Sequence, residues 1–234
     1  TFSPCPYFRC NKVYCFNIKK NKSLELKFGI KNSKWVCIHN RDERFLELKS
    51  KSFSYHDHRN FNIKDMSLAA DWLTRQGYYV IRVGNIAKDR LTSKNPRIID
   101  YPFKEFKNDY ADIYFLGRCQ FYLGSTSGVA NVPDLFRKPS YIINVIPLND
   151  SLAWPRTTAA IFKKLKKNNQ ILSLKKYLSL NLENIARAEV YNKKKIQVLN
   201  NSSHEILELA KQAHRELTKG KQKNLKYDRK IKKY

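Results

Sequence analysis

One part of the sequence, between residues 111 and 145, limits the fold more than any other. Its pattern changes in five steps: apolar residues at helical spacing over 111–117, an apolar run over 120–123, small residues over 124–128, a second helical stretch over 129–136 and a β-branched run over 140–145. This order predicts helix, strand, turn, helix and strand. Two such strands joined through a helix lie parallel in one sheet, so we expect a βαβ unit.

Earlier residues extend the same alternation. The run from Lys34 to Asn40 is apolar and ends in charged residues, which is typical of a buried strand. A helical pattern then starts after Asn62, a candidate helix cap, and ends at Gly77, and strands are predicted over 78–83 and 97–101. The polar stretch 55–60 shows neither period, so we expect a long loop there. The fold class is therefore α/β, a Rossmann-like parallel sheet with helices on both faces, whose ligands bind at the carboxyl ends of the strands.

Four segments are expected along the chain. Residues 1–33 are interpreted as a linker or the remnant of another domain, so that the chain would be a fragment, and residues 34–150 as the Rossmann-like core. Residues 151–219 are expected to be a helical part that packs on the core, with helices near 172–178 and over 203–217, the latter capped by Ser202 or Ser203. Residues 220–234 form a basic tail that we expect to be disordered.

Charge and cysteine content indicate which partners and which cellular location to expect for this protein. The 234 residues include 46 Lys and Arg against 20 Asp and Glu, a net charge of +26, which favours anionic partners. Because the lysines cluster beside asparagines, as in Lys163 to Lys167, we expect solvated surfaces, with peripheral contact to an anionic membrane ahead of nucleic acid. The five cysteines are an odd number, and no apolar run approaches the ~20 residues that span a bilayer. These features predict a cytoplasmic protein, peripheral at the inner face of the cell membrane.

The small-residue turn Gly124-Ser125-Thr126-Ser127-Gly128 opens the second helix of the βαβ unit. Its hydroxyls, unpaired N–H groups and the helix dipole would suit a phosphate. The alternative is that a hydroxyl merely caps the helix. The turn is neither a P-loop nor a dinucleotide fingerprint, and it fits a hydrolase nucleophile poorly, which weakens kinase, dehydrogenase and hydrolase functions.

Basic and polar side chains follow the strands that are predicted to end at this edge. Arg41, Arg59 and Arg82 would converge there, and guanidinium suits a diphosphate, although each could instead be a surface ion pair. His39 and Asp100 are further ligand candidates, and Asn60 belongs to the same set, whereas Asp112 is expected only to cap the next helix. No metal site is predicted, because His56 and His58, like Cys5, Cys10 and Cys15, lack partners that would complete one.

The segments VCIHNRDERFL, YHDHRNFNI, GYYVIRVG, IIDYP and ADIYFLGRCQFYLGSTSGVANVPDLFRKPSYIINVIPL, with NSSHEILELAKQAH downstream, carry a family resemblance. They resemble the nucleotide-sugar half of bacterial surface-polysaccharide glycosyltransferases. More distantly, they are similar to fucosyltransferases of the GT-B fold, in which a strand ending in His-x-Arg is followed by Asp-Ile-x-Phe-Leu, a strand and a Ser-rich turn.

The resemblance implies the C-terminal, donor-binding domain of a GT-B enzyme, with residues 1–33 left from an acceptor domain. Arg41 and Arg82 would hold the donor diphosphate together with Ser125, Thr126, Ser127 and Gly128. His39 and Asp100 would lie near the nucleoside, Arg59 and Asn60 elsewhere in the cleft. Asp42 or Glu43 would be the catalytic base. Asp42 stands where the fucosyltransferases have a second basic residue, which leaves the donor sugar and nucleotide open.

The implied reaction moves a sugar from a nucleoside-diphosphate sugar, GDP-linked donors among the candidates, to a glycan or lipid-linked glycan of the bacterial envelope. It would be inverting and metal-independent and need no cofactor, because positive charge stabilises the leaving diphosphate. The alternative is a non-catalytic basic module that binds nucleotides or nucleic acid. Salt dependence of oligonucleotide binding separates the two.

Overall fold

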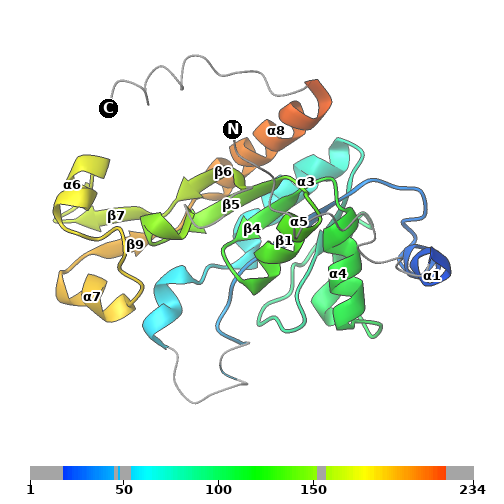
Figure 1. Cartoon of the computed structure of the whole chain (residues 1–234), viewed down its shortest axis with the longest axis horizontal. Helices are drawn as coiled ribbons and strands as arrows, with labels where there is room; N and C mark the ends of the chain where they lie inside the picture. The colour runs from blue at the N-terminus through cyan, green and yellow to red at the C-terminus, as the bar shows by residue number, and fades with distance from the viewer. Residues whose placement is uncertain (1–17, 45–46, 48–53, 152–156, 220–234) are drawn as a thin grey trace, which may run out of the picture. The chain divides into compact units, whose positions relative to one another are not determined.

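The computed structural model describes residues 18–44, 47, 54–151 and 157–219 (Figure 1). The chain divides into two compact units, residues 1–33 and 34–234. Helix α1 (Ile18–Lys27) belongs to the first unit, and every other element described below belongs to the second. The predicted basic tail over 220–234 and the first three cysteines lie outside the described residues.

The second unit is built on a six-stranded sheet with the order β3-β2-β1-β4-β5-β6, in which every neighbouring pair is parallel. The strands are β1 (Trp35–His39), β2 (Tyr79–Arg82), β3 (Ile98–Asp100), β4 (Tyr122–Ser125), β5 (Ser140–Val145) and β6 (Thr157–Phe162). The predicted α/β class and the parallel sheet are confirmed. In chain order, β2 and β3 are added on one side of β1, and β4, β5 and β6 on its other side. The strand order therefore reverses between β1 and β4. Ligands of open parallel sheets bind at such a point.

Helices cover both faces of this sheet. On one face, α3 (Ser67–Arg75) and α8 (Ser203–Lys219) contact each other and share a core with Val36 and Ile38 of β1. Trp35, which precedes Val36, points to the opposite face and donates through Nε1 to Phe115 O, 2.9 Å away, in α4 (Asp109–Arg118). Helix α4 contacts α5 (Asn131–Leu135). The predicted capping box begins α8, because Ser202 and Glu205 exchange side-chain and backbone hydrogen bonds.

Three local predictions differ from the structure. Residues 54–59, predicted as loop, form the 3₁₀ helix η2 (Ser54–Arg59), and the predicted helix over 129–136 is divided into η5 (Gly128–Ala130) and α5. Gly124 and Ser125 end β4 instead of belonging to a turn. Glycine is required at 124, since a Cβ there would lie 2.6 Å from His39 O and 2.5 Å from the Tyr122 hydroxyl.

The C-terminal region contains strands as well as helices. Beyond β6, β7 (Lys164–Lys167) pairs antiparallel with β8 (Gln170–Ile171) and with β9 (Gln197–Leu199). The helices α6 (Leu174–Ser179) and α7 (Ala188–Lys193) follow β8, and a separate small core holds this part together: Ile146, Leu165, Leu182, Tyr191 and Ile196. Residues 151–219 therefore add a strand to the main sheet and a second sheet beside it.

The remaining short helices are η3 (Ile63–Met66), η4 (Tyr101–Phe103) and η6 (Leu148–Ser151). Asn62 caps η3, as predicted, through Oδ1, which accepts from Lys64 N at 2.9 Å. Within the described residues, the structure contains no helix that combines the length and the apolar character needed to cross a bilayer.

Candidate functional site

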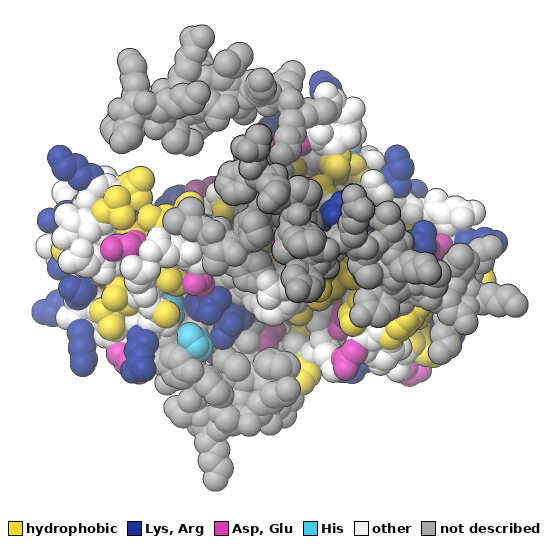
Figure 2. All heavy atoms as spheres, in the orientation of Figure 1, with side chains coloured by type: hydrophobic (Ala, Val, Ile, Leu, Met, Phe, Trp, Pro, Cys, Tyr) yellow, Lys and Arg dark blue, Asp and Glu magenta, His cyan; other side chains and the backbone are white. Residues whose placement is uncertain are grey.

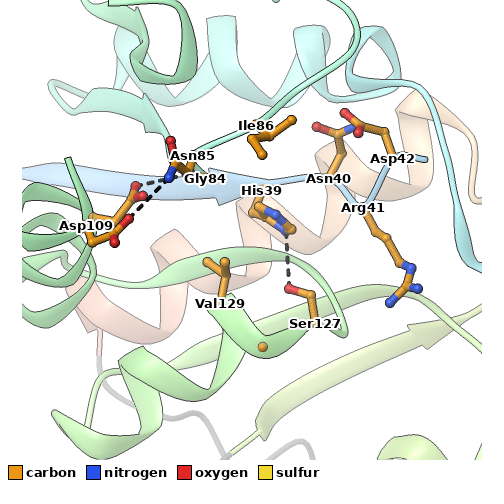
Figure 3. Close-up of a pocket in the computed structure, with 12 residues that line it drawn as sticks. His39, Asn40, Arg41, Asp42, Gly84, Asn85, Ile86, Asp109, Ser127 and Val129 are labelled. Atoms are coloured by element: carbon orange, nitrogen blue, oxygen red, sulfur yellow. Dashed lines mark hydrogen bonds between the residues drawn. The ribbon is translucent and has the colours of Figure 1, made fainter. Parts of the chain in front are cut away.

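A cavity of about 350 Å³ opens where the strand order reverses (Figure 3). Its volume lies within the range of small-ligand pockets. Segments that follow β1, β2 and β4 line it together with the first turn of α4: His39, Asn40, Arg41, Asp42, Gly84, Asn85, Ile86, Asp109, Asp112, Ser127, Gly128 and Val129. The switch point of the sheet and a pocket with convergent polar groups therefore coincide.

Arg41 lies on one side of this pocket. Its backbone N–H donates to Ser125 Oγ at 2.9 Å, so the loop after β1 is fixed to the last residue of β4. The guanidinium extends away from His39 (Figure 3). Ser125 and Thr126 are buried, and the Thr126 hydroxyl accepts from Arg59 at 3.1 Å. Of the three hydroxyl residues in the predicted phosphate turn, Ser127 lines the cavity, while Ser125 and Thr126 hold protein groups.

His39 stands at the centre of the pocket. Its Nδ1 lies 3.4 Å from Ser127 Oγ, and Gly84, at φ +122°, approaches its ring so closely that a Cβ would lie 3.4 Å from Cδ2. Burial, with Arg82 and Arg41 nearby, lowers the pKa of His39 to about 3, so the imidazole is neutral at physiological pH. Ser127 makes no side-chain cap bond to η5, and both helical pieces after it are short. We therefore assign no helix-dipole role here.

The opposite side of the pocket is acidic. Asp112 Oδ1 accepts from Gly84 N at 3.0 Å, and Asp109 Oδ1 accepts from Asn85 Nδ2 at 3.2 Å. Burial raises the pKa of Asp112 to about 6, against the lowering effect of the Gly84 hydrogen bond. Sequence reasoning took Asp112 for a helix cap and overlooked Asp109 and Asn85. The signal was the spacing of three between the two aspartates, which places both on one side of the first turn.

The two candidate bases differ in position. Asp42 lines the pocket, but both its carboxylate oxygens accept backbone hydrogen bonds, Oδ1 from Arg44 N at 3.1 Å and Oδ2 from Lys88 N at 3.0 Å. Glu43 does not line the pocket and forms an ion pair with the Lys88 ammonium group. Asp42 thus organises the loop after β1 as well as facing the cavity.

Arg82 and Asp100 lie behind the pocket lining and are not part of it. The Arg82 side chain is 1% exposed and is held by Asp100 Oδ1 at 3.1 Å, by Asp89 O at 2.6 Å and by Asn40 Oδ1 at 2.9 Å. The other Asp100 oxygen accepts from Leu91 N at 2.8 Å. These two predicted ligand residues connect the ends of β1, β2 and β3 and do not line the cavity.

Arg59 and Asn60 also lie outside the cavity lining. Arg59 Nη2 donates to Thr126 and forms an ion pair with Asp150 Oδ2 at 3.2 Å. Asn60 Nδ2 lies 3.4 Å from Asp57 Oδ1. The structure therefore brings together His39, Arg41, Asp42, Ser127 and Gly128 of the predicted set, and places Arg59 beside them on the far side of Thr126.

Metal ligands were not predicted, and the described residues contain no group of three or more His, Cys, Asp or Glu side chains placed to hold a metal. The His58 ring packs 5.4 Å from that of Tyr191. Cys37 and Cys119 are buried free thiols, as their apolar surroundings predicted. The absence of a metal or cofactor from the reaction stays a prediction.

Comparisons with known proteins give the following. No family model and no curated protein matches the chain. Among solved structures, it is similar to the iron-containing dodecameric glycosyltransferase TibC of enterotoxigenic E. coli H10407, with 14% identity and a TM-score of 0.46 over 80% of this chain and 48% of that one. It is also similar to the heptosyltransferase TibC in complex with ADP-D-beta-D-heptose, with 13% identity and a TM-score of 0.44 over 80% and 46%. The chain spans about half the length of these proteins.

Proposed function

We propose that residues 34–219 form the nucleotide-sugar-binding part of a glycosyltransferase of GT-B type. The observation that carries this proposal is the pocket at the switch point of the parallel sheet, basic at Arg41 and acidic at Asp109 and Asp112. A nucleoside-diphosphate sugar has the matching polarity, because its diphosphate is anionic and its base and ribose carry N–H and O–H donors.

In this arrangement the diphosphate lies at Arg41 and Ser127, and the nucleoside extends past His39 toward Asp112. An ionised carboxylate accepts paired N–H groups, and guanine presents two on one edge, so GDP-linked donors suit this end best. The neutral His39 adds one hydrogen-bonding position without adding charge.

The chemistry would be inverting transfer without a metal. Arg41 offsets the negative charge that grows on the leaving diphosphate, as a metal ion does elsewhere. Of the two candidate bases we favour Asp42, since it lines the pocket and Glu43 does not. We propose a glycan or lipid-linked glycan of the bacterial envelope as acceptor, reached from the cytoplasmic face of the membrane through the basic surface.

Calorimetry tests the proposal. GDP, UDP, CDP and ADP, with their common sugar conjugates including ADP-heptose, are titrated with and without Mg²⁺. We expect selective, metal-independent binding of one diphosphate, weakened by Arg41→Gln. If a folded sample binds no nucleotide, and an oligonucleotide instead binds with a steep salt dependence, the basic-module alternative takes its place.

A further inference from the structure

The residues of η2 lie next to Arg41 because backbone and side-chain bonds hold them there. Phe61 N donates to Arg41 O at 3.2 Å, and Asn40 Nδ2 donates to Phe61 O at 3.1 Å. On the other side, the buried Lys163 ammonium group donates to His58 O at 2.8 Å, to Asn60 O at 2.9 Å and to Asn200 Oδ1 at 2.6 Å. The C-terminal end of the segment that carries His56 and Arg59 is thus fixed from two sides, by the loop after β1 and by Lys163.

Two arginines, a histidine and two carboxylates gather where this segment meets Thr126. Arg59 is joined to Asp150 at 3.2 Å, while its Nε is buried and has no hydrogen-bond partner among the described residues. Burial, and then the charges of Arg41 and Arg59, lower the pKa of His56, and its bond to the Ala186 backbone and the charge of Asp150 only partly oppose this. Asp57, on the exposed side, is a second carboxylate near Arg41 and His56. The charges of both guanidinium groups act on Asp150, which is partly buried.

Basic side chains gather on this face beside η2, with a histidine and acidic side chains next to them (Figure 2). Arg41 belongs both to the cavity and to this cluster, so the two are continuous around the turn of Ser125 to Ser127. A tetrahedral anion suits such a cluster, because a guanidinium can donate two parallel hydrogen bonds to it. The Nε–H of Arg59 also needs an acceptor.

We propose that Arg41, His56 and Arg59 form a subsite for a phosphoryl group beside Thr126, outside the cavity proper. The group has two sources: the second phosphate of a nucleotide bound in the cavity, or a phosphate of the acceptor. Only the choice between these sources rests on the proposed function, because inorganic phosphate probes the subsite by itself.

The test is a phosphate titration of the whole chain, followed by NMR of the histidine rings and by calorimetry. Bound phosphate should raise the pKa of His56, whose signal is assigned with His56→Gln, because an anion replaces repulsion with attraction. We expect Arg59→Gln to weaken phosphate binding about tenfold or more. Arg44→Gln is the matched control, since Arg44 is an exposed arginine that pairs with Glu47. Arg59→Lys keeps the positive charge but loses the paired N–H donors of the guanidinium, so its phosphate affinity should be intermediate.

Nucleotide titrations then distinguish the two possible sources of the phosphoryl group. If the subsite holds the second phosphate of the donor, the nucleoside diphosphate competes with phosphate, and Arg59→Gln weakens the diphosphate but not the monophosphate. If it serves the acceptor, phosphate still binds to protein saturated with nucleotide. A phosphate response at His56 in a chain that binds no nucleotide would keep the subsite and reject the proposed function. An unmoved His56 signal, or equal phosphate affinity in folded Arg59→Lys and wild-type chains, would overturn the subsite.

Discussion

The backbone N–H of Arg41 donates to Ser125 Oγ at 2.9 Å, across 84 positions of the sequence. This bond joins the second residue after β1 to the last residue of β4, the two strands between which the sheet order reverses. It fixes the start of the Arg41 side chain at the pocket mouth, while the guanidinium remains directed outward (Figure 3).

Replacing Arg41 tests the diphosphate end of the pocket. Arg41→Gln removes the positive charge and the paired N–H donors of the guanidinium but keeps the backbone hydrogen bond to Ser125. A hydrogen bond to a charged group contributes about 1.5–3 kcal/mol, so nucleoside-diphosphate affinity should fall roughly tenfold to a hundredfold. Calorimetry gives the dissociation constant. Arg44→Gln, on the same loop, should bind like wild type, and an unchanged constant in Arg41→Gln would remove Arg41 from the site.

The two serines of the turn should behave differently. Ser125→Ala leaves the partly buried Arg41 N–H without its acceptor, which costs about 1–3 kcal/mol of unfolding free energy. Ser127→Val removes a hydroxyl that lies 3.4 Å from His39 Nδ1 and also interacts with the Tyr122 hydroxyl, so stability should fall less than in Ser125→Ala and nucleotide affinity should fall severalfold. Denaturant unfolding and calorimetry separate the two effects. Wild-type binding by Ser127→Val would leave this hydroxyl without a role in phosphate binding.

The sheet was predictable from sequence because its signals are local. The apolar runs that became β1, β2 and β4 are buried on both faces, and the pattern of such strands does not depend on distant partners. The predicted Asn62 cap and the Ser202–Glu205 capping box are equally local. The same reasoning predicted a loop where the structure has η2, because a six-residue 3₁₀ helix of polar residues produces no hydrophobic periodicity in the sequence.

The site residues were less predictable, since their roles depend on contacts between distant segments. Arg82 ends β2 and Arg41 lies two residues past β1, yet only Arg41 lines the cavity. Asp100 lies in register with Arg82 on β3, and Asn40 accepts from Arg82 just after β1. Lys163 was expected on a solvated surface with its neighbouring lysines. It is buried, and its three acceptors come from two other segments.

The pKa of Asp112, raised to about 6 from 3.8, makes stability depend on pH. Between about pH 4 and 6 the folded chain binds more protons than the unfolded chain, so the free energy of unfolding falls as pH rises through this window. Asp112→Asn keeps an acceptor for Gly84 N and should be more stable than wild type by ~1–3 kcal/mol at pH 7.5, with no gain at pH 4. Denaturant unfolding at both values checks this. Equal differences at the two pH values would contradict it.

Two glycines at the end of β4 and in the turn after it form a matched pair for substitution. A Cβ at Gly124 would meet His39 O at 2.6 Å, whereas a Cβ at Gly128 would meet nothing within 4 Å. Gly124→Ala should therefore force β1 and β4 apart and destabilise the chain by about 1–3 kcal/mol, with loss of nucleotide binding. Gly128→Ala should unfold like wild type. Thermal unfolding of the pair decides, and similar melting temperatures would mean that the close approach at Gly124 is relieved at no cost.

Lys163 should give stability the opposite dependence on pH. Burial, then Arg59, lowers its pKa from 10.5 to about 7, so between these values the unfolded chain binds the extra proton and the free energy of unfolding rises with pH. Lys163→Met removes this contribution, which amounts to at most ~1.4 kcal/mol per pH unit. It also leaves His58 O, Asn60 O and Asn200 Oδ1 without their donor, so the variant should be less stable throughout.

Groups that both chains share cancel in the difference between wild type and variant from pH 7 to 10. That difference should grow with pH in denaturant unfolding, while Lys164→Met, which removes an exposed lysine paired with Glu205, should show a flat one. A difference for Lys163→Met that stays constant over this range would mean that the ammonium group keeps an ordinary pKa.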